Sequence, residues 1–420
     1  MRINKLTSAL AVVGLATISS SVWATDGYFS DGYGIKAKGM AGTSIAQPQD
    51  TLAAANNPAG MVLQGDRLDV GLDWFRPIRT GELRGNGNPA NNGTYDASDK
   101  KNFLIPEFGY NKMLSQDMSV GVSVYGNGGM NTSYTKPFPL FGTTNPGIDL
   151  SQLFIAPTFS MKLNQSNSVG ISVNFAYQRF KATGLQNFDN STYSSSPGNV
   201  TDRGYDSSTG WGVKVGWIGQ VTPDLSFGLT YQSKTSMGKF DKYKGLFAEQ
   251  GGFDIPENYG AGFSWKVAPA WTVSGDVKQI QYSKVASVGD SVNCLFAGAC
   301  KLGTNNGAGF GWNDMTVYKL GVSYQQSQNL TLRAGYSYGK QPIPESQTLL
   351  NMLAPAVNND HMTLGATWTL ANKSEVTVAY MHAFDNTVSG SNSIPSGFGG
   401  GNTNLKMYQD SLGVAYGMKF

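Results

Sequence analysis

The final fifteen residues, 406–420, alternate along the chain with a period of two. Successive side chains of a β-strand point to opposite faces, so one face of this segment is oily and the other is small or polar. The oily face carries Leu412, Val414, Tyr416, Met418 and Phe420. An apolar outer face and a polar inner face are typical of the wall of a transmembrane β-barrel. The segment is therefore predicted to be a membrane strand, and similar segments recur upstream.

Fourteen such segments are expected to be strands, and short polar turns join them in pairs. The predicted strands are residues 67–79, 102–114, 118–127, 151–163, 168–181, 209–221, 225–234, 257–267, 271–284, 313–326, 330–340, 359–371, 375–386 and 406–420. Long loops rich in Gly, Asn, Ser and Pro separate the pairs. Short turns on one rim and long loops on the other are the layout of an outer-membrane barrel with an even strand number. We therefore predict an all-β fold, a 14-stranded antiparallel transmembrane β-barrel over residues 66–420, with a soluble all-β protein as the alternative.

The composition argues against membrane-spanning helices. Charged residues make up 14% of the chain, the mean hydropathy is −0.25, and no run of eighteen apolar residues occurs. The 53 glycines in 420 residues exceed the usual ~7%. The net charge of +3 gives no indication of a nucleic-acid partner.

Residues 1–24 have the pattern of a secretory signal peptide. A basic start at Arg2 and Lys5 precedes an apolar stretch, and Val22-Trp23-Ala24 forms a plausible cleavage site. The mature chain is thus expected to begin at Thr25, outside the cytoplasm, although a short buried helix is an alternative. An exported chain can keep a disulfide, so Cys294 and Cys300 are predicted to clip a loop. No metal site is expected, because no His lies near these thiols in the sequence.

Residues 25–65 do not fit the wall. They are rich in Gly and Ala, lack alternation, and are too few for a core of their own. Fourteen strands enclose more space than wall side chains fill, since about eight strands suffice for a packed interior. This segment is therefore predicted to fold inward as a plug, or hatch. A disordered tail is the alternative.

The hatch sequence also carries a resemblance to a known family. The matching pieces are Gly34, Gly39 and Gly42, the stretch 50–55, the tripeptide Asn57-Pro58-Ala59, the segment 105–110 (IPEFGY) and Phe420. In these pieces and in its layout the chain resembles the FadL-type outer membrane transporters of long-chain fatty acids. That family includes relatives that take up aromatic hydrocarbons.

The resemblance implies a monomeric, hatch-plugged barrel of the bacterial outer membrane that works without energy input. Substrate would be caught on extracellular loops, move to an inner apolar pocket, and leave sideways at a kink of the third strand. Glycine permits a bulge or bend in a strand, so the kink candidates are Gly126, Gly128 and Gly129, with entry into an ordinary loop as the alternative. Asn57 is expected to satisfy backbone groups near that kink, beside the rigid Pro58, unless the tripeptide forms only a turn.

Two loops correspond to the family's outer hydrophobic groove. The candidate capture residues are Phe138, Leu140 and Phe141 in the first loop, and Leu185 and Phe188 in the second. Exposed apolar clusters indicate a partner, but the same residues could instead pack together as a small loop core.

A carboxylate substrate would require a basic group inside the barrel. By alternation Lys278, Lys319 and Arg333 point inward, and they are the candidates. If no basic group lines the pocket, hydrocarbons become the better substrate class. Lumenal charges are also common because the interior of such barrels is polar.

Three rival functions remain. An enzyme is disfavoured, since the chain has two His and no nucleophile motif, and no phosphate-binding GxxxxGK[ST] occurs. A general aqueous porin and a surface adhesin stay open as alternatives. We predict passive uptake of hydrophobic compounds, most readily long-chain fatty acids and alternatively aromatic hydrocarbons. No cofactor is expected, and outer membrane lipid and lipopolysaccharide are expected as neighbours.

Overall fold

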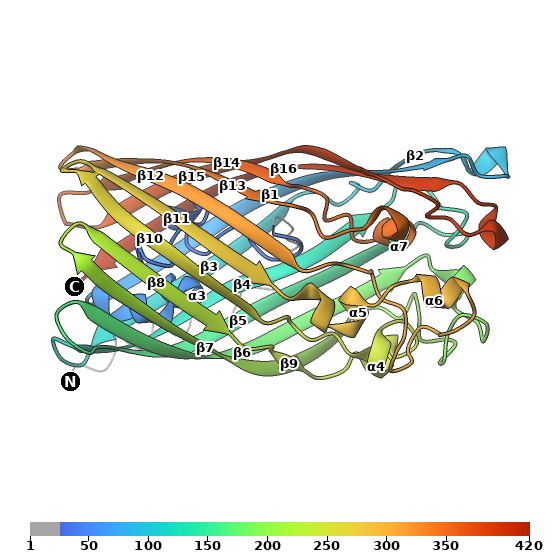
Figure 1. Cartoon of the computed structure of the whole chain (residues 1–420), viewed down its shortest axis with the longest axis horizontal. Helices are drawn as coiled ribbons and strands as arrows, with labels where there is room; N and C mark the ends of the chain where they lie inside the picture. The colour runs from blue at the N-terminus through green and yellow to red at the C-terminus, as the bar shows by residue number, and fades with distance from the viewer. Residues whose placement is uncertain (1–25) are drawn as a thin grey trace, which may run out of the picture.

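The computed structural model describes residues 26–420, so the predicted signal peptide lies outside the described residues. The wall strands are β1 (Arg67–Arg84), β3 (Phe103–Met113), β4 (Met118–Ser133), β5 (Gly147–Lys162), β6 (Asn167–Thr183), β7 (Asp206–Thr222), β8 (Leu225–Gln232), β10 (Asn258–Ala268), β11 (Trp271–Ile280), β12 (Met315–Ser327), β13 (Leu330–Gly339), β14 (Asp360–Thr369), β15 (Glu375–Ser389) and β16 (Asn402–Lys419). Two short strands, β2 (Gly93–Asp96) and β9 (Ser236–Met237), pair beside β1 and β7. Figure 1 shows the strands tilted around one axis, with short turns at one end and long loops at the other.

The sheet closes on itself. Each long strand pairs antiparallel with its neighbours, and β16 pairs with β1 from Arg67–Lys419 to Arg84–Asn402. The predicted 14-stranded antiparallel barrel is thereby confirmed. Several of the predicted strand ends are wrong; β1, for example, ends at Arg84 and not at residue 79. The third strand, β4, runs on to Ser133 because its glycines bend the strand without ending it, and β11 stops at Ile280, before the one-turn helix η6 (Tyr282–Lys284).

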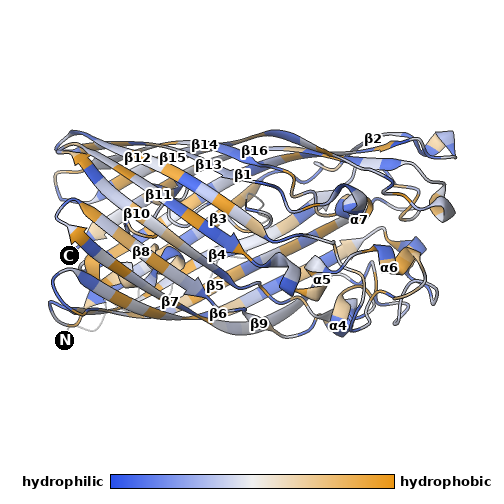
Figure 2. Cartoon of the chain, in the orientation of Figure 1, coloured by the Kyte–Doolittle hydropathy of each residue, from blue (hydrophilic) through white to orange (hydrophobic). Residues whose placement is uncertain are grey.

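The outer surface of the wall is apolar. Alternate large side chains remain exposed along the strands, as Leu229, Leu320 and Leu364 do, each 53–54% accessible. The hydropathy colouring shows orange and blue segments alternating along the strands (Figure 2). This is the arrangement of a wall that faces hydrocarbon outside and a polar interior. Within residues 26–420 no helix is long and apolar enough to cross a membrane.

Short helices occupy the loops and the lumen. The lumenal ones are α2 (Ile35–Lys38), α3 (Ala53–Asn56) and η2 (Pro58–Leu63). The loop helices are η3 (Pro89–Asn91), η4 (Gln186–Phe188), η5 (Asp241–Tyr243), α4 (Ala248–Gly251), α5 (Ala286–Gly289), α6 (Asn293–Phe296), η7 (Glu345–Gln347), α7 (Thr348–Asn351) and η8 (Ser396–Phe398).

Residues 26–65, which we call the hatch, fill the lumen and are mostly buried. They lie against a band of inward-facing wall glycines. At each of these positions an added Cβ would crowd or overlap hatch atoms: Gly109, Gly121, Gly170, Gly216, Gly228, Gly321, Gly335, Gly365 and Gly413. The close approach of hatch to wall accounts for part of the glycine surplus, because only a residue without a side chain leaves room for the hatch backbone.

Candidate functional site

The wall is incomplete between β3 and β4. These strands pair only from Phe108–Val124 to Met113–Ser119. Beyond that point β3 continues along β1 down to Phe103, while β4 continues along β5 through a bulge between Gly126 and Gly128. Residues 103–107 of β3 and 125–133 of β4 therefore have no hydrogen-bonded ladder between them. This opening lies at the predicted kink glycines Gly126, Gly128 and Gly129.

The first hatch residues form hydrogen bonds with the unpaired backbone groups at this opening. Ser30 N donates to Asn127 O at 3.2 Å, and Gly129 N donates to Tyr28 O at 2.9 Å. The Tyr33 hydroxyl donates to Asn127 O at 2.9 Å. A Cβ on Gly128 would overlap Tyr28 O, so this glycine is needed for the close approach. An unpaired backbone group in hydrocarbon costs several kcal/mol, so these contacts stabilise the open edge.

Asn57 lies elsewhere, and the expectation that it serves the kink is wrong. Its Nδ2 donates to Ile45 O at 2.8 Å, to Trp217 O at 3.0 Å and to Leu229 O at 3.3 Å. The last two carbonyls belong to β7 and β8, three and four strands from β4. Pro58 and Ala59 begin the helix η2, and Ala59 N donates back to Asn57 Oδ1 at 3.1 Å. Tyr28, Ser30 and Tyr33 make the contacts at the kink instead, a role that the sequence motif did not indicate.

The three candidate cations have different partners. Lys319 Nζ lies 2.9 Å from Asp26 Oδ2 and 3.1 Å from Asp31 Oδ1, so hatch carboxylates neutralise it. Arg333 donates to Gln49 and Thr367 at 2.9 and 2.6 Å. Lys278 Nζ lies 5.1 Å from the ring centre of Phe29 and 5.8 Å from that of Tyr33. Among the described residues Lys278 forms no ion pair.

Wall carboxylates hold the rest of the hatch by its backbone. Amides of Gly34 and Ile35 donate to Glu107, those of Ser44 and Ile45 to Asp276, and that of Thr51 to Asp69, at 2.8–3.1 Å. Lys36 adds an ion pair with Glu375 at 2.5 Å. Burial is the main reason that the pKa of the Asp50 carboxyl rises to about 6, with the nearby Asp69 adding to it. The hatch is thus bound to the wall by buried polar contacts as well as by packing.

The five candidate capture residues are buried, not exposed. Phe138, Leu140, Phe141, Leu185 and Phe188 are at most 6% accessible. The rings of Phe138 and Phe141 lie 4.8 Å apart, and those of Phe141 and Phe188 lie 5.7 Å apart. The expectation of an exposed cluster is therefore wrong, because the two loops cover each other's apolar side chains.

An apolar cavity of about 30 Å³ lies beneath these loops. Its lining contains no charged side chain and comprises Ile148, Phe180, Leu185, Phe188, Leu246, Phe247, Ser287, Leu302, Ala308, Gly309, Phe310, Leu350 and Leu353. From the cavity, a chain of ring contacts runs inward. Phe247 lies 4.9 Å from Phe253, Phe253 lies 6.1 Å from Tyr28, and Tyr28 lies 5.2 Å from Phe29. The chain ends at the hatch residues that occupy the wall opening.

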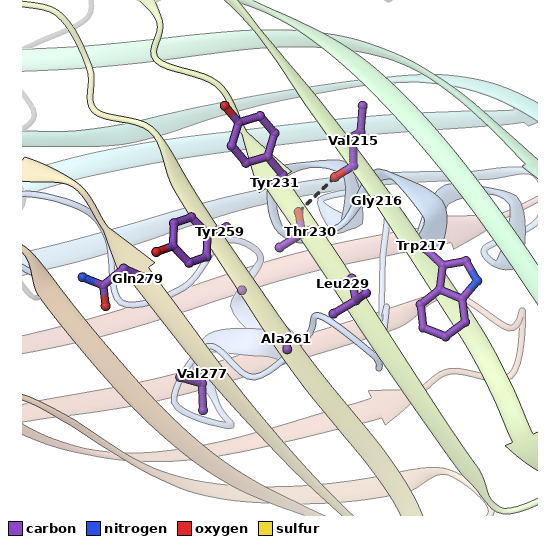
Figure 3. A pocket seen from close by; sticks show the side chains of 11 residues that line it. Val215, Gly216, Trp217, Leu229, Thr230, Tyr231, Tyr259, Ala261, Val277 and Gln279 are labelled. Carbon is purple, nitrogen blue, oxygen red and sulfur yellow. Dashed lines mark hydrogen bonds between the residues drawn. The ribbon is translucent and has the colours of Figure 1, made fainter. Parts of the chain in front are cut away.

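A separate groove of about 560 Å³ lies on the lipid-facing surface of β7, β8, β10 and β11 (Figure 3). The exposed side chains of Leu229, Tyr231, Tyr259 and Val277 line it, around the small side chain of Ala261. It faces away from the lumen, so it is not part of the path from the cavity to the opening.

A serine, an aspartate and a histidine lie close together in the lumen. Ser337 donates to Asp31 Oδ1 at 3.1 Å and lies 3.2 Å from His361 Nδ1. Because the serine lies between the carboxylate and the imidazole, the carboxylate does not orient the histidine as in a catalytic triad. Across residues 26–420 no cluster of three or more His, Cys, Asp or Glu could hold a metal. Cys294 and Cys300 form a disulfide, with sulfurs 2.02 Å apart, in the β11–β12 loop.

Known proteins resemble the chain over almost its whole length. A family model described as outer membrane protein transport protein (OMPP1/FadL/TodX) matches residues 15–420. An outer membrane protein of Neisseria meningitidis serogroup B is 22% identical over 471 residues, which cover 99% of each chain.

Solved structures share the fold. The toluene transporter TodX of Pseudomonas putida has a TM-score of 0.70 at 18% identity, covering 93% of this chain and 99% of its own. A FadL homologue of Pseudomonas aeruginosa has a TM-score of 0.71 at 14% identity, covering 94% and 100%. The toluene transporter TbuX of Ralstonia pickettii has a TM-score of 0.67 at 16% identity, covering 93% and 99%. At these identities the likeness concerns the fold.

Proposed function

Because the chain belongs to the OMPP1/FadL/TodX family of outer membrane transport proteins, we propose that it carries uncharged hydrophobic compounds, the size of one aromatic ring, inward across the outer membrane. Transport is passive and needs a single chain, since cavity, hatch and wall opening all belong to one barrel. The family is one of transporters and not of enzymes. The route runs from the loop cavity along the ring chain to the opening between β3 and β4.

The uncharged cavity supports this substrate class. Its lining offers hydrophobic contact but no group that could pair with a carboxylate. Lys319 is paired with two hatch carboxylates, and Arg333 is bonded to neutral oxygens of Gln49 and Thr367. An ionised substrate would lose its hydration in the cavity without gaining a partner, which is costly.

The wall opening supports lateral exit. Leaving apolar contact for water costs about 0.8 kcal/mol per methylene, so an exit into the bilayer avoids a penalty that a water-filled pore would impose. The hatch residues at the opening contribute aromatic rings on the inside and cover the backbone of β4. They must move aside for a solute to pass.

Uptake by a deletion strain and its complemented partner tests the proposal. We expect radiolabelled toluene to enter the complemented strain faster and oleate to enter both strains equally. Methyl oleate, which lacks the charge but keeps the chain, separates the effects of charge and of length. Equal toluene entry in both strains, with no redundant transporter present, would contradict the proposal.

Long-chain fatty acids are a second candidate, and one observation favours them. Lys278 has no ion pair among the described residues and lies beside Phe29, at the inner end of the ring chain. A carboxylate that reached this point would find a free cation. Under this reading Lys278→Met would slow oleate uptake and leave toluene uptake unchanged, whereas an equal effect on both would exclude a role in carboxylate binding.

A further inference from the structure

The loop between β15 and β16 carries one aromatic side chain in a run of glycines. Residues 397–401 read Gly-Phe-Gly-Gly-Gly. The backbone φ angles of Gly399, Gly400 and Gly401 are +88°, +65° and +90°, in the left-handed region that glycine adopts at little cost. The glycines thus let the chain turn directly after Phe398, which ends the helix η8.

The ring of Phe398 contacts three other rings across the barrel mouth. Its centre lies 6.0 Å from that of Phe188, stacked at 16°, and 5.8 Å from that of Tyr193, both in the β6–β7 loop. It lies 5.4 Å from the ring centre of Phe296 in the β11–β12 loop. We call these four residues the aromatic clasp.

The backbone beside Phe398 is anchored from a further loop. Asn86, between β1 and β2, donates from Nδ2 to Phe398 O at 2.8 Å and to Gly400 O at 2.9 Å. Gly87 N donates to Gly399 O at 2.8 Å. The backbone at residues 398–400 is therefore fixed by hydrogen bonds, while the half-buried side chain of Phe398 packs against three rings.

The clasp adjoins the apolar cavity, because Phe188 belongs to both, and Phe398 packs on Phe188 from outside the lining. The cavity measures about 30 Å³. An engineered apolar cavity that binds benzene measures ~150 Å³, so a ring-sized solute cannot occupy this one without displacing its roof. The structure is consequently a closed form, and some part of the roof has to yield on entry.

We propose that Phe398 is the entry gate, an aromatic side chain that rotates aside about its own side-chain bonds while Asn86 and Gly87 hold the backbone of the loop. The inference rests on the proposed function. An arriving aromatic solute can replace the ring contacts that Phe398 gives up, since offset-stacked and edge-to-face pairs are interchangeable among aromatic groups. A polar solute cannot replace them. The gate therefore opens more readily for the compounds that the cavity accepts.

The first test measures access to the cavity and does not depend on transport. Leu353, which lines the cavity and is 3% exposed, is replaced by cysteine, and its labelling by N-ethylmaleimide is timed on the full-length protein in detergent. Adding Phe398→Ala should speed labelling roughly tenfold, because three ring contacts are lost. The matched control is Phe384→Ala on the lipid-facing surface, which should leave the rate unchanged. Equal rates in both variants would overturn the proposal.

The second test locks the gate. Tyr193→Cys and Phe398→Cys are combined and joined by a short bismaleimide, and each single variant receives the same reagent. We expect toluene uptake to be lost only in the joined double variant. Normal uptake by the joined protein would refute the gate and leave the transport function standing, whereas absence of protein-dependent uptake in the wild type would refute the function itself. The labelling test reports on the gate in either case.

Discussion

Removal of the Lys319 ammonium group tests how the hatch holds the wall opening. Lys319 Nζ lies 2.9 Å from Asp26 Oδ2 and 3.1 Å from Asp31 Oδ1, and all three side chains are at most 5% exposed. The substitution Lys319→Met keeps most of the side-chain volume and removes the charge. Two carboxylates then remain buried without their cation.

The expected effect is large because the site is dry. Removing one partner of a buried ion pair costs ~3–5 kcal/mol, since the remaining charge is uncompensated. If the first hatch residues can leave the wall and become hydrated, their detached population should rise roughly 150- to 5,000-fold. Detachment breaks the hydrogen bond from Ser30 N to Asn127 O and that from Gly129 N to Tyr28 O.

Hydrogen exchange followed by mass spectrometry measures this change, because amide exchange reports the free energy of local opening. In Lys319→Met the amides of Ser30 and Gly129 should exchange faster, while strands far from the opening keep their rates. Lys214→Met is the matched control, since Lys214 is a buried wall lysine that forms no ion pair among the described residues and donates to Ala55 O, outside residues 26–30. A triple variant with Asp26→Asn and Asp31→Asn should restore slow exchange. Unchanged exchange in Lys319→Met would show that the ion cluster does not hold the segment.

Two further predictions concern the rest of the hatch. In Gly216→Val the new side chain would overlap Asn57 Oδ1. Such overpacking costs ~1–3 kcal/mol of stability, so the melting temperature should fall correspondingly. The control Gly397→Val, at a position with open space around it, should leave the melting temperature unchanged. The pKa of Asp50, about 6 in the folded protein, lies above its unfolded value of ~3.9, so its contribution to stability is lost as pH rises from about 4 to 6. Asp50→Asn should reduce the fall in melting temperature across that range, and an identical fall would contradict the assignment.

The barrel could be predicted from sequence because alternation along a strand is a local property. Residues 406–420 show which side chains face lipid, and strand pairing follows from the turns. The extent of β4 could not be predicted, because glycines at 126–129 are compatible both with the end of a strand and with a bulge inside one. The pairing of Gly129 with Ser151 of β5 and its hydrogen bond to Tyr28 O of the hatch decide between them, and both are long-range contacts.

The candidate site was harder to predict for the same reason. Inward direction could be assigned to Lys278 and Lys319 by alternation, but their partners lie about 250–290 residues away along the chain, in the hatch. Asn57 was recognised in its motif, yet the strands that it contacts depend on how the hatch is seated. Burial of Phe138 and Phe188 likewise follows from loops packing on one another, which leaves no periodic signal in sequence.

The contacts divide the hatch into a fixed and a releasable part. From Gly34 onward, backbone amides are bonded to carboxylates of three wall strands, and packing against glycines leaves no room for displacement. Residues 26–30, in contrast, are held at the opening chiefly by the Lys319 cluster, by Tyr282 and by two backbone hydrogen bonds to β4. On the proposed route, a solute would have to displace only this short segment. The proposed lateral exit is therefore compatible with a lumen that stays plugged from Gly34 onward.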